Sequence, residues 1–222
     1  MGSFTPLPPT TAEAARYALL RRLAPSMRHH LVVNLQPIGM IFEVMDRRLR
    51  APAPDLAQVQ ESAGKINGFA KAALASCIDV ISWLAPDDAA GTSVADGARE
   101  CCALLATSLS FRGYALRNEV PDLGGSVRRP AVRNLLSAAL LHCADSHPAP
   151  AELTLGAAAD ADGARVTITF QAAAADRPHM AAELNYRRIA WEDLEALAAA
   201  DGVQLAREGE SVVLRLPWLA AP

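Results

Sequence analysis

Two adjacent histidines, His29 and His30, are the residues of this sequence best suited to chemistry. They lie in a stretch where apolar residues recur at steps of three and four, the spacing of an amphipathic helix. On such a helix His29 lies about 200° from both Met27 and Leu31, so it faces away from the apolar seam. An exposed imidazole is largely neutral near pH 7 and can act as a nucleophile. His30 flanks the seam, and from the spacing alone both histidines could be ordinary surface residues.

Two long helices are predicted to carry and flank these histidines. Apolar seams with the spacing of paired helices run through residues 20–49 and 56–84. A short loop with prolines at 52 and 54 separates them, so the pair should form an antiparallel hairpin. Pro25 and Pro37 fall inside the first stretch, where they should interrupt or bend the helix.

Further apolar residues lie off the two seams, so two helices alone cannot cover them all. These are Ile41, Val44, Leu74, Ile78 and Ile81. Pairing of two copies into a four-helix bundle would cover this second stripe, and so would packing on the rest of the chain. We expect the homodimer, with intramolecular packing as the alternative.

The second half of the chain has a mixed pattern. Period-two alternation around Asp162-Gly163 and Glu208-Gly209 predicts two β-hairpins. Apolar residues at helical spacing predict helices near 98–109, 131–144 and 190–200. The expected fold is therefore α+β, with a helical hairpin domain at residues 1–90 and one sheet backed by helices at 91–222.

The spacing around the histidines resembles the dimerisation and phosphoacceptor domain of two-component histidine kinases. In that family, apolar residues stand two positions before the acceptor and two, six and nine after it. With His29 as acceptor, these positions are filled by Met27, Leu31, Leu35 and Ile38. The family's acidic residue after the acceptor is replaced here by His30, and its polar residue four positions on by Val33. Taking His30 as the acceptor would place Asn34 in that polar position but would disrupt the seam.

The second half resembles the ATP-binding domain of the same family, in a degenerate form. Residues 101–120 resemble its first helix and strand, and residues 132–147 its asparagine-bearing helix. Ala138 and His142 stand where that helix carries asparagines. The Asp-x-Gly-x-Gly segment that contacts nucleotide is missing, since residues 165–200 contain no glycine. The resemblance thus implies an α/β sandwich that binds no ATP, so we do not expect an ATP-dependent autokinase.

The resemblance implies a histidine phosphotransferase that moves phosphoryl groups between receiver-domain aspartates through His29, with His30 as runner-up. The response-regulator receiver would supply Mg²⁺, so no cofactor or metal is expected in this chain. Four residues are expected to contact the receiver: Arg22, Arg28, Asn34 and Gln36. The alternative is a non-catalytic adaptor that binds a signalling partner, which the loss of the acidic neighbour favours.

Composition narrows the function classes further. The 222 residues are 51% hydrophobic and 20% charged with a net charge of −3, which does not fit a nucleic-acid binder. No run approaches the ~20 apolar residues of a membrane span, and no secretory signal is visible. The four cysteines lack CxxC spacing, so we expect reduced thiols in a bacterial cytoplasm. His142, Cys143 and His147 have metal-compatible spacing, but a buried thiol and helix-end histidines explain them better.

Overall fold

The computed structural model describes residues 9–173 and 186–220. Contacts divide the chain into two compact units, residues 24–85 and a second unit formed by residues 1–23 with 86–222. This division differs from the predicted one, which placed all of residues 1–90 in the helical domain. Within the described ranges, no helix has the length and hydropathy needed to cross a bilayer.

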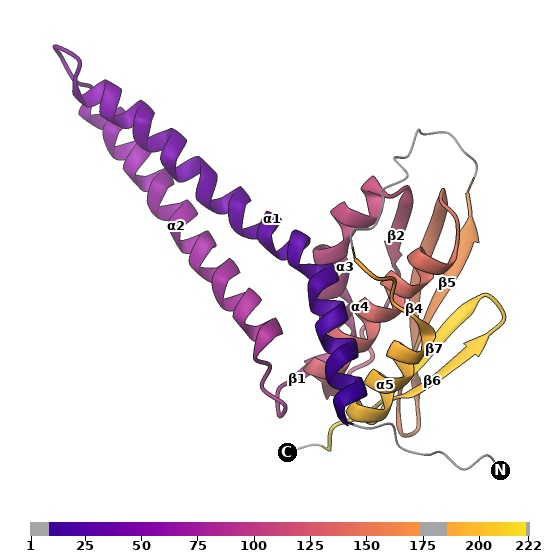
Figure 1. The fold of residues 1–222 in the computed structure, drawn as a ribbon. Coiled ribbons are helices and arrows are strands. Elements are labelled where there is room, and N and C mark those ends of the chain that lie inside the picture. The colour runs from indigo at the N-terminus through magenta and orange to yellow at the C-terminus, as the bar shows by residue number, and fades with distance from the viewer. Residues whose placement is uncertain (1–8, 174–185, 221–222) are drawn as a thin grey trace, which may run out of the picture. The chain divides into compact units, whose positions relative to one another are not determined.

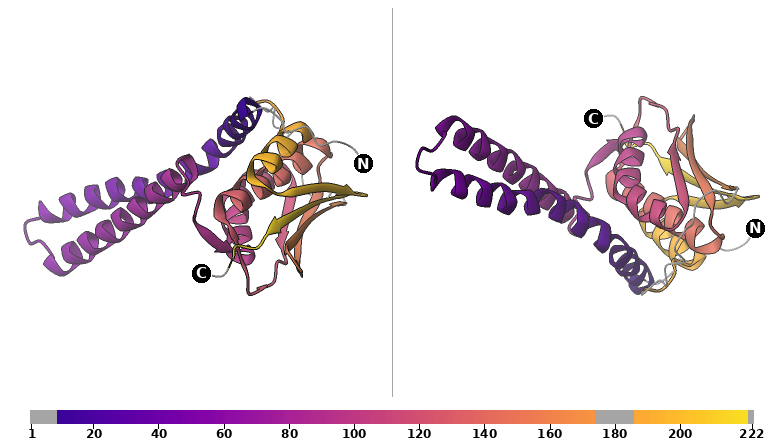
Figure 2. Two further views of the ribbon diagram at one scale, coloured as in Figure 1. Left: turned by 90° about the horizontal axis from the view of Figure 1, so that it is seen from below. Right: turned by 90° about the horizontal axis from the view of Figure 1, so that it is seen from above.

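Residues 24–85, the helical unit, form an antiparallel helical hairpin (Figures 1 and 2). It contains most of α1 (Pro9–Leu49) and all of α2 (Leu56–Leu84), as the two seams predicted. Pro25 and Pro37 both lie within α1, so neither proline ends the helix. Asp55 caps α2, because its carboxylate accepts hydrogen bonds from two backbone N–H groups of the first turn.

The second unit, which we call the α/β unit, contains a five-stranded mixed sheet in the order β2-β4-β5-β7-β6. Only β2 and β4 pair in parallel, and the other neighbours are antiparallel. The strands are β2 (Tyr114–Asn118), β4 (Ala151–Asp160), β5 (Gly163–Ala172), β6 (Gln204–Glu208) and β7 (Ser211–Pro217). Both predicted hairpins are present, as β4-β5 and β6-β7.

Three helices cover one face of this sheet: α3 (Val94–Phe111), α4 (Arg129–Ser146) and α5 (Trp191–Asp201) (Figures 1 and 2). Alternate residues of β4 and β5 point toward them and are buried, among them Leu153, Leu155 and Ile168. Helix α4 is buried on nearly every side because it packs against α3, α5 and the sheet. The α+β fold class is confirmed.

A short antiparallel pair, β1 (Gly91–Ser93) and β3 (Ser126–Arg128), lies outside the main sheet. No pattern in the sequence predicted this pair, because three-residue strands carry almost no periodic signal. β1 leads directly into α3, whose first turn is capped by the hydroxyl of Ser93. Part of the segment between α2 and α3 is therefore an ordered strand of the α/β unit.

The N-terminal part of α1, residues 9–23, packs on the α/β unit. Its buried side chains recur at steps of three and four: Ala12, Ala15, Leu19 and Leu23. Arg16 donates to Asp201 at 3.1 Å, and Arg22 pairs with Asp145. This apolar stripe and these two ion pairs explain why residues 9–23 group with the α/β unit.

Candidate functional site

His29 is exposed on the surface of α1, as its helical phase predicted. Met27, two residues earlier, is buried, and Leu31 is half-buried. His30 is half-buried, and its ring centroid lies 6.3 Å from that of His29. Of the two imidazoles, His29 is therefore the more accessible to a partner protein.

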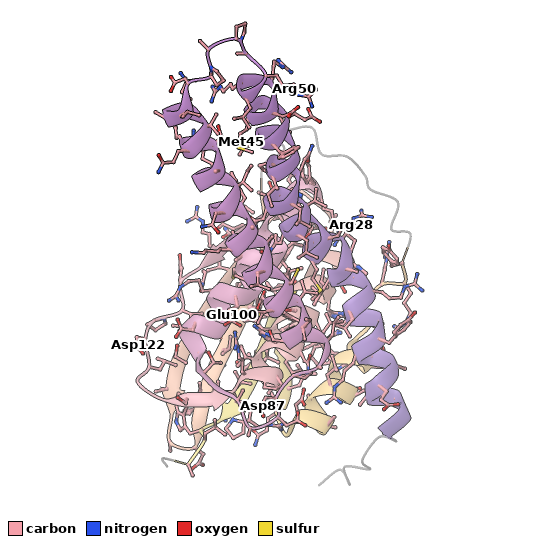
Figure 3. All side chains as sticks on the ribbon, turned by 90° about the vertical axis from the view of Figure 1, so that its left-hand side faces the viewer. Arg28, Met45, Arg50, Asp87, Glu100 and Asp122 are labelled. Atoms are coloured by element: carbon pink, nitrogen blue, oxygen red, sulfur yellow. The ribbon has the colours of Figure 1, made fainter. Side chains whose placement is uncertain are left out.

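Exposed side chains around His29 are placed where they could contact a phosphoryl group on its ring. Arg28 is exposed beside it and carries a permanent positive charge (Figure 3). Gln36 is also exposed and lies seven residues after His29, which places it on the same helical face about two turns away. Val33 stands between them and is exposed, so this part of the face is partly apolar. The roles expected for Arg28 and Gln36 are compatible with these positions.

Asn34 faces the second helix of the hairpin. Its side-chain amide donates to the hydroxyl of Ser76 in α2 at 3.0 Å and to the carbonyl of His30 at 3.1 Å. Both hydrogen bonds are made within the helical unit, and the residue is half-buried. The side-chain amide of Asn34 is thus engaged within the helical unit, and its expected contact with a receiver stays a prediction. The residue is a hydrogen-bonded tie between the two helices.

Arg22 is not part of an exposed docking surface, which corrects the prediction. Its guanidinium donates two hydrogen bonds to the carboxylate of Asp145, at 2.5 and 2.9 Å, and both side chains are almost fully buried. The two residues are 123 positions apart in the sequence, so no local pattern could reveal the pair. The sequence did indicate that this part of α1 packs against another element, since Leu19 and Leu23 continue an apolar stripe toward the N-terminus.

Asp145 collects hydrogen bonds from three parts of the α/β unit. Besides Arg22, it accepts from Arg112 at 2.7 Å and from the backbone N–H of Ile189 at 3.0 Å. Burial alone would raise the pKa of Asp145, but Arg22, the Ile189 N–H and Arg112 together hold that pKa below its ordinary value. The carboxylate thus stays ionised and joins α1, α3, α4 and the segment before α5.

His142, which the resemblance aligns with an asparagine of the nucleotide-binding helix, is buried and hydrogen-bonded. Its Nδ1 lies 2.8 Å from the carbonyl of Ile189, and its Nε2 lies 3.3 Å from the guanidinium of Arg207. Since a carbonyl only accepts, Nδ1 carries the proton and Nε2 accepts from Arg207. The ring also lies beside Trp191, with centroids 5.8 Å apart. Both polar atoms of His142 are thus already used within the chain.

The other residues with metal-compatible spacing lie at the C-terminal end of α4. His147 stacks on Phe170, with ring centroids 4.1 Å apart. Burial raises the pKa of the Cys143 thiol to about 12, which makes it a poor thiolate ligand. Among the described residues, no group of three or more histidine, cysteine or acidic side chains is placed to hold a metal ion.

The glycine-poor segment that follows β5 lies partly outside the described residues. β5 ends at Ala172, and residues 174–185 are not described. The loss of the nucleotide-contacting motif is a property of the sequence, and its structural consequence stays a prediction.

No protein-family model and no curated protein matches this sequence. Solved structures do resemble the chain. A histidine kinase from Burkholderia phymatum is 19% identical, with 97% of this chain and 100% of that chain covered, at a TM-score of 0.44. A bacterial phosphotransferase is 14% identical, with 96% and 98% covered, at 0.42. The catalytic domain of the histidine kinase ThkA is 10% identical, with 58% and 94% covered, at 0.45.

The proteins that this chain resembles in structure are thus histidine kinases and a phosphotransferase, the class that the sequence resemblance indicated. Identities below 20% and TM-scores below 0.5 carry no information about activity.

Proposed function

We propose that this chain is a histidine phosphotransferase of a two-component phosphorelay. In this proposal His29 accepts a phosphoryl group from the aspartate of one receiver domain and passes it to another. The observation that carries the proposal is the solvent-exposed imidazole of His29 on a helical hairpin whose apolar spacing matches that around a kinase phosphoacceptor. Arg28 beside it supplies positive charge for an incoming phosphoryl group.

The transfer needs no nucleotide. A ring nitrogen of neutral His29 attacks the phosphorus of an aspartyl phosphate, a phosphorus–nitrogen bond forms, and the aspartate leaves as a carboxylate. The ring proton on the other nitrogen is then released to water, and the reverse steps deliver the group to a second receiver. Such transfers depend on in-line positioning and on neutralisation of the phosphoryl oxygens. The receiver's Mg²⁺ would supply most of that charge, and Arg28 would add to it.

His29 is favoured over His30 by exposure. His30 is half-buried, and its carbonyl accepts a hydrogen bond from Asn34, which in turn bonds Ser76. A partner would reach His29 without breaking these hydrogen bonds between the helices. His30 remains the alternative acceptor, because the two residues are adjacent.

The helical unit is proposed to act as a homodimer. Large apolar side chains of both helices remain exposed in the chain, including Met40, Phe42, Leu74, Ile78 and Ile81. Exposed apolar surface of this extent is typical of an interaction site. Two hairpins forming a four-helix bundle would cover these residues and leave the His29 face open.

A non-catalytic adaptor is the second candidate function. The residues that flank the two histidines are Arg28 and Leu31, so the acidic residue that follows the acceptor in the kinase family is absent from the adjacent positions. An adaptor would still bind a receiver but would not take its phosphoryl group. An aspartyl phosphate is an activated donor whose leaving group is a carboxylate, so its transfer to an imidazole does not require a neighbouring base. We therefore favour the phosphotransferase.

The experiment incubates the full chain with a panel of radioactively phosphorylated receiver domains. We expect label on this chain that is lost in acid and kept in base, as phosphohistidine is. His29→Ala should abolish the label, whereas the matched variant His30→Ala should keep it. Absence of label with every receiver would favour the adaptor, and loss only in His30→Ala would reassign the acceptor. Calorimetric binding of ATP to the full chain would overturn the expected absence of a nucleotide site.

A further inference from the structure

A buried histidine of the α/β unit accepts its hydrogen bond from a positively charged side chain. His142 in α4 is 7% exposed, and its Nε2 accepts from the guanidinium of Arg207 in β6 at 3.3 Å. Its Nδ1–H donates to the carbonyl of Ile189 at 2.8 Å. We propose that His142 is a pH-sensitive switch, which holds the edge strand β6 against α4 when neutral and releases it when protonated. This switch lies within the α/β unit and does not depend on the proposed phosphotransfer.

Protonation of His142 removes the acceptor that Arg207 uses. A neutral imidazole has one N–H and one lone pair, whereas a protonated imidazole donates from both ring nitrogens. The new Nε2–H then faces a guanidinium that can only donate and that always carries its charge. The hydrogen bond is lost, and two positive charges face each other at a buried site, where repulsion is stronger than in water. The Nδ1–H bond to Ile189 exists in both states, so only the contact with Arg207 responds to pH.

Two carboxylates lie near His142, and arginines already neutralise both. Asp145 accepts from the N–H of Ile189, the residue whose carbonyl His142 binds. Asp193 lies in the first turn of α5, two residues after Trp191, whose ring is in contact with His142. The arginine partners are Arg22 and Arg112 for Asp145, and Arg187 for Asp193. Neither carboxylate therefore offers an unpaired negative charge that would offset the repulsion from Arg207.

Arg207 relies on His142 for its polar contact. Among the residues that the structure describes, the guanidinium of Arg207 forms no ion pair and hydrogen-bonds only His142. It also lies 4.1 Å from the ring centroid of Trp191, within the range of cation–π attraction. The indole N–H of Trp191 donates to Glu195 at 2.9 Å, which orients the ring. Since β6 pairs with β7 alone in the sheet, these contacts of Arg207 tie the edge strand to the helices that cover the sheet.

His147, at the end of α4, should respond to protonation in the opposite direction. Its Nδ1 lies 2.9 Å from the carbonyl of Cys143, and its Nε2 lies 3.5 Å from the carboxylate of Glu210. A proton on Nε2 would point at that carboxylate and strengthen the contact. The effect should be small, because the side chain of Glu210 is 75% exposed. His147 is thus a matched control for His142 on the same helix.

The test measures amide hydrogen exchange in the full chain at about pH 7.5 and about pH 5.5, above and below the ordinary histidine pKa of about 6.5. Protection factors are corrected for the intrinsic exchange rate at each pH. Opening of β6 lets His142 take up a proton that the closed form excludes. We therefore expect protection of residues 204–208 to fall about tenfold at the lower pH, because stability changes by up to a factor of about ten per pH unit.

Two variants should remove this loss of protection. In His142→Gln, the side-chain amide still offers a donor to Ile189 and an acceptor to Arg207, but it does not titrate. In Arg207→Met, the positive charge is removed, and a side chain that can pack on Trp191 is kept. Arg207 is exposed, so this second variant tests the switch even if His142→Gln does not fold. The control His147→Gln should keep the full loss.

Three results would overturn the switch. The first is equal protection of residues 204–208 at both pH values in the wild type. The second is a loss that persists in His142→Gln or Arg207→Met, or that disappears in His147→Gln, because another group would then be responsible. The third is an equal loss in the central strand β5, since the whole sheet would then be unfolding. None of these results bears on phosphotransfer, which is measured separately with phosphorylated receivers.

Discussion

The helical unit and the α/β unit differ in how far their large apolar side chains are buried. In residues 24–85, Ile78 is 59% exposed and Phe42 is 55% exposed, and only Met27, Ala73 and Trp83 are buried apolar residues. In the α/β unit, Ile168 and Leu140 are fully buried. A single chain therefore completes the core of the α/β unit but leaves a broad apolar surface on the hairpin. The α/β unit thus buries its own core, whereas the hairpin keeps an exposed apolar surface that we propose a second copy covers.

Charged residues show the same contrast. The hairpin carries exposed pairs at helical spacing, such as Asp46 with Arg50, which contribute little to stability. The α/β unit instead contains Asp145, shared by Arg22 and Arg112 and almost fully buried. Burial makes that carboxylate a structural requirement, because both guanidinium groups would otherwise lack a counter-ion.

Among the variants that test this difference between the units, Asp145→Ala should have the largest effect on stability. It leaves Arg22 and Arg112 without their carboxylate, and we expect the free energy of unfolding of the α/β unit to fall by about 3–5 kcal/mol. Urea denaturation measures the change. The matched variant Asp46→Ala, in the exposed pair, should change stability by about 0.5 kcal/mol or less. Equal effects of the two variants would contradict the distinction between the units.

A pair of isoleucine truncations tests which apolar surface is completed by a second copy. Ile168→Ala removes a fully buried side chain and should lower the free energy of unfolding by about 2–5 kcal/mol at any protein concentration. Ile78→Ala/Ile81→Ala should instead raise the dimer dissociation constant about 100-fold or more, as measured by sedimentation. A wild-type chain that sediments as a monomer at all concentrations would refute the dimer.

Gly68→Ala should have the smallest effect on stability. The sign of that effect tells whether position 68 packs against a second copy. Gly68 is exposed within α2, and a Cβ built there meets no atom within 4 Å. Alanine is the better helix former, so the variant should stabilise the hairpin by about 0.5–1 kcal/mol in thermal unfolding. A concentration-dependent destabilisation would instead mean that position 68 packs closely against the second copy.

Local patterns predicted most of the fold. The seams predicted both long helices, and period-two alternation predicted both β-hairpins, because each signal lies within one element. The boundary between the units and the pairs made by Arg22 and Asn34 were missed, since they depend on contacts between residues far apart in sequence. For His29 the helical phase was sufficient to predict exposure, whereas its chemical role stays a prediction.

The most direct measurement locates the phosphoryl group on the chain. The chain is phosphorylated by a receiver and digested at neutral pH, and the peptide that covers both histidines is fragmented in a mass spectrometer. We predict that the added phosphoryl mass lies on His29. Its location on His30 alone, or an unmodified peptide after incubation with every receiver, would contradict the account.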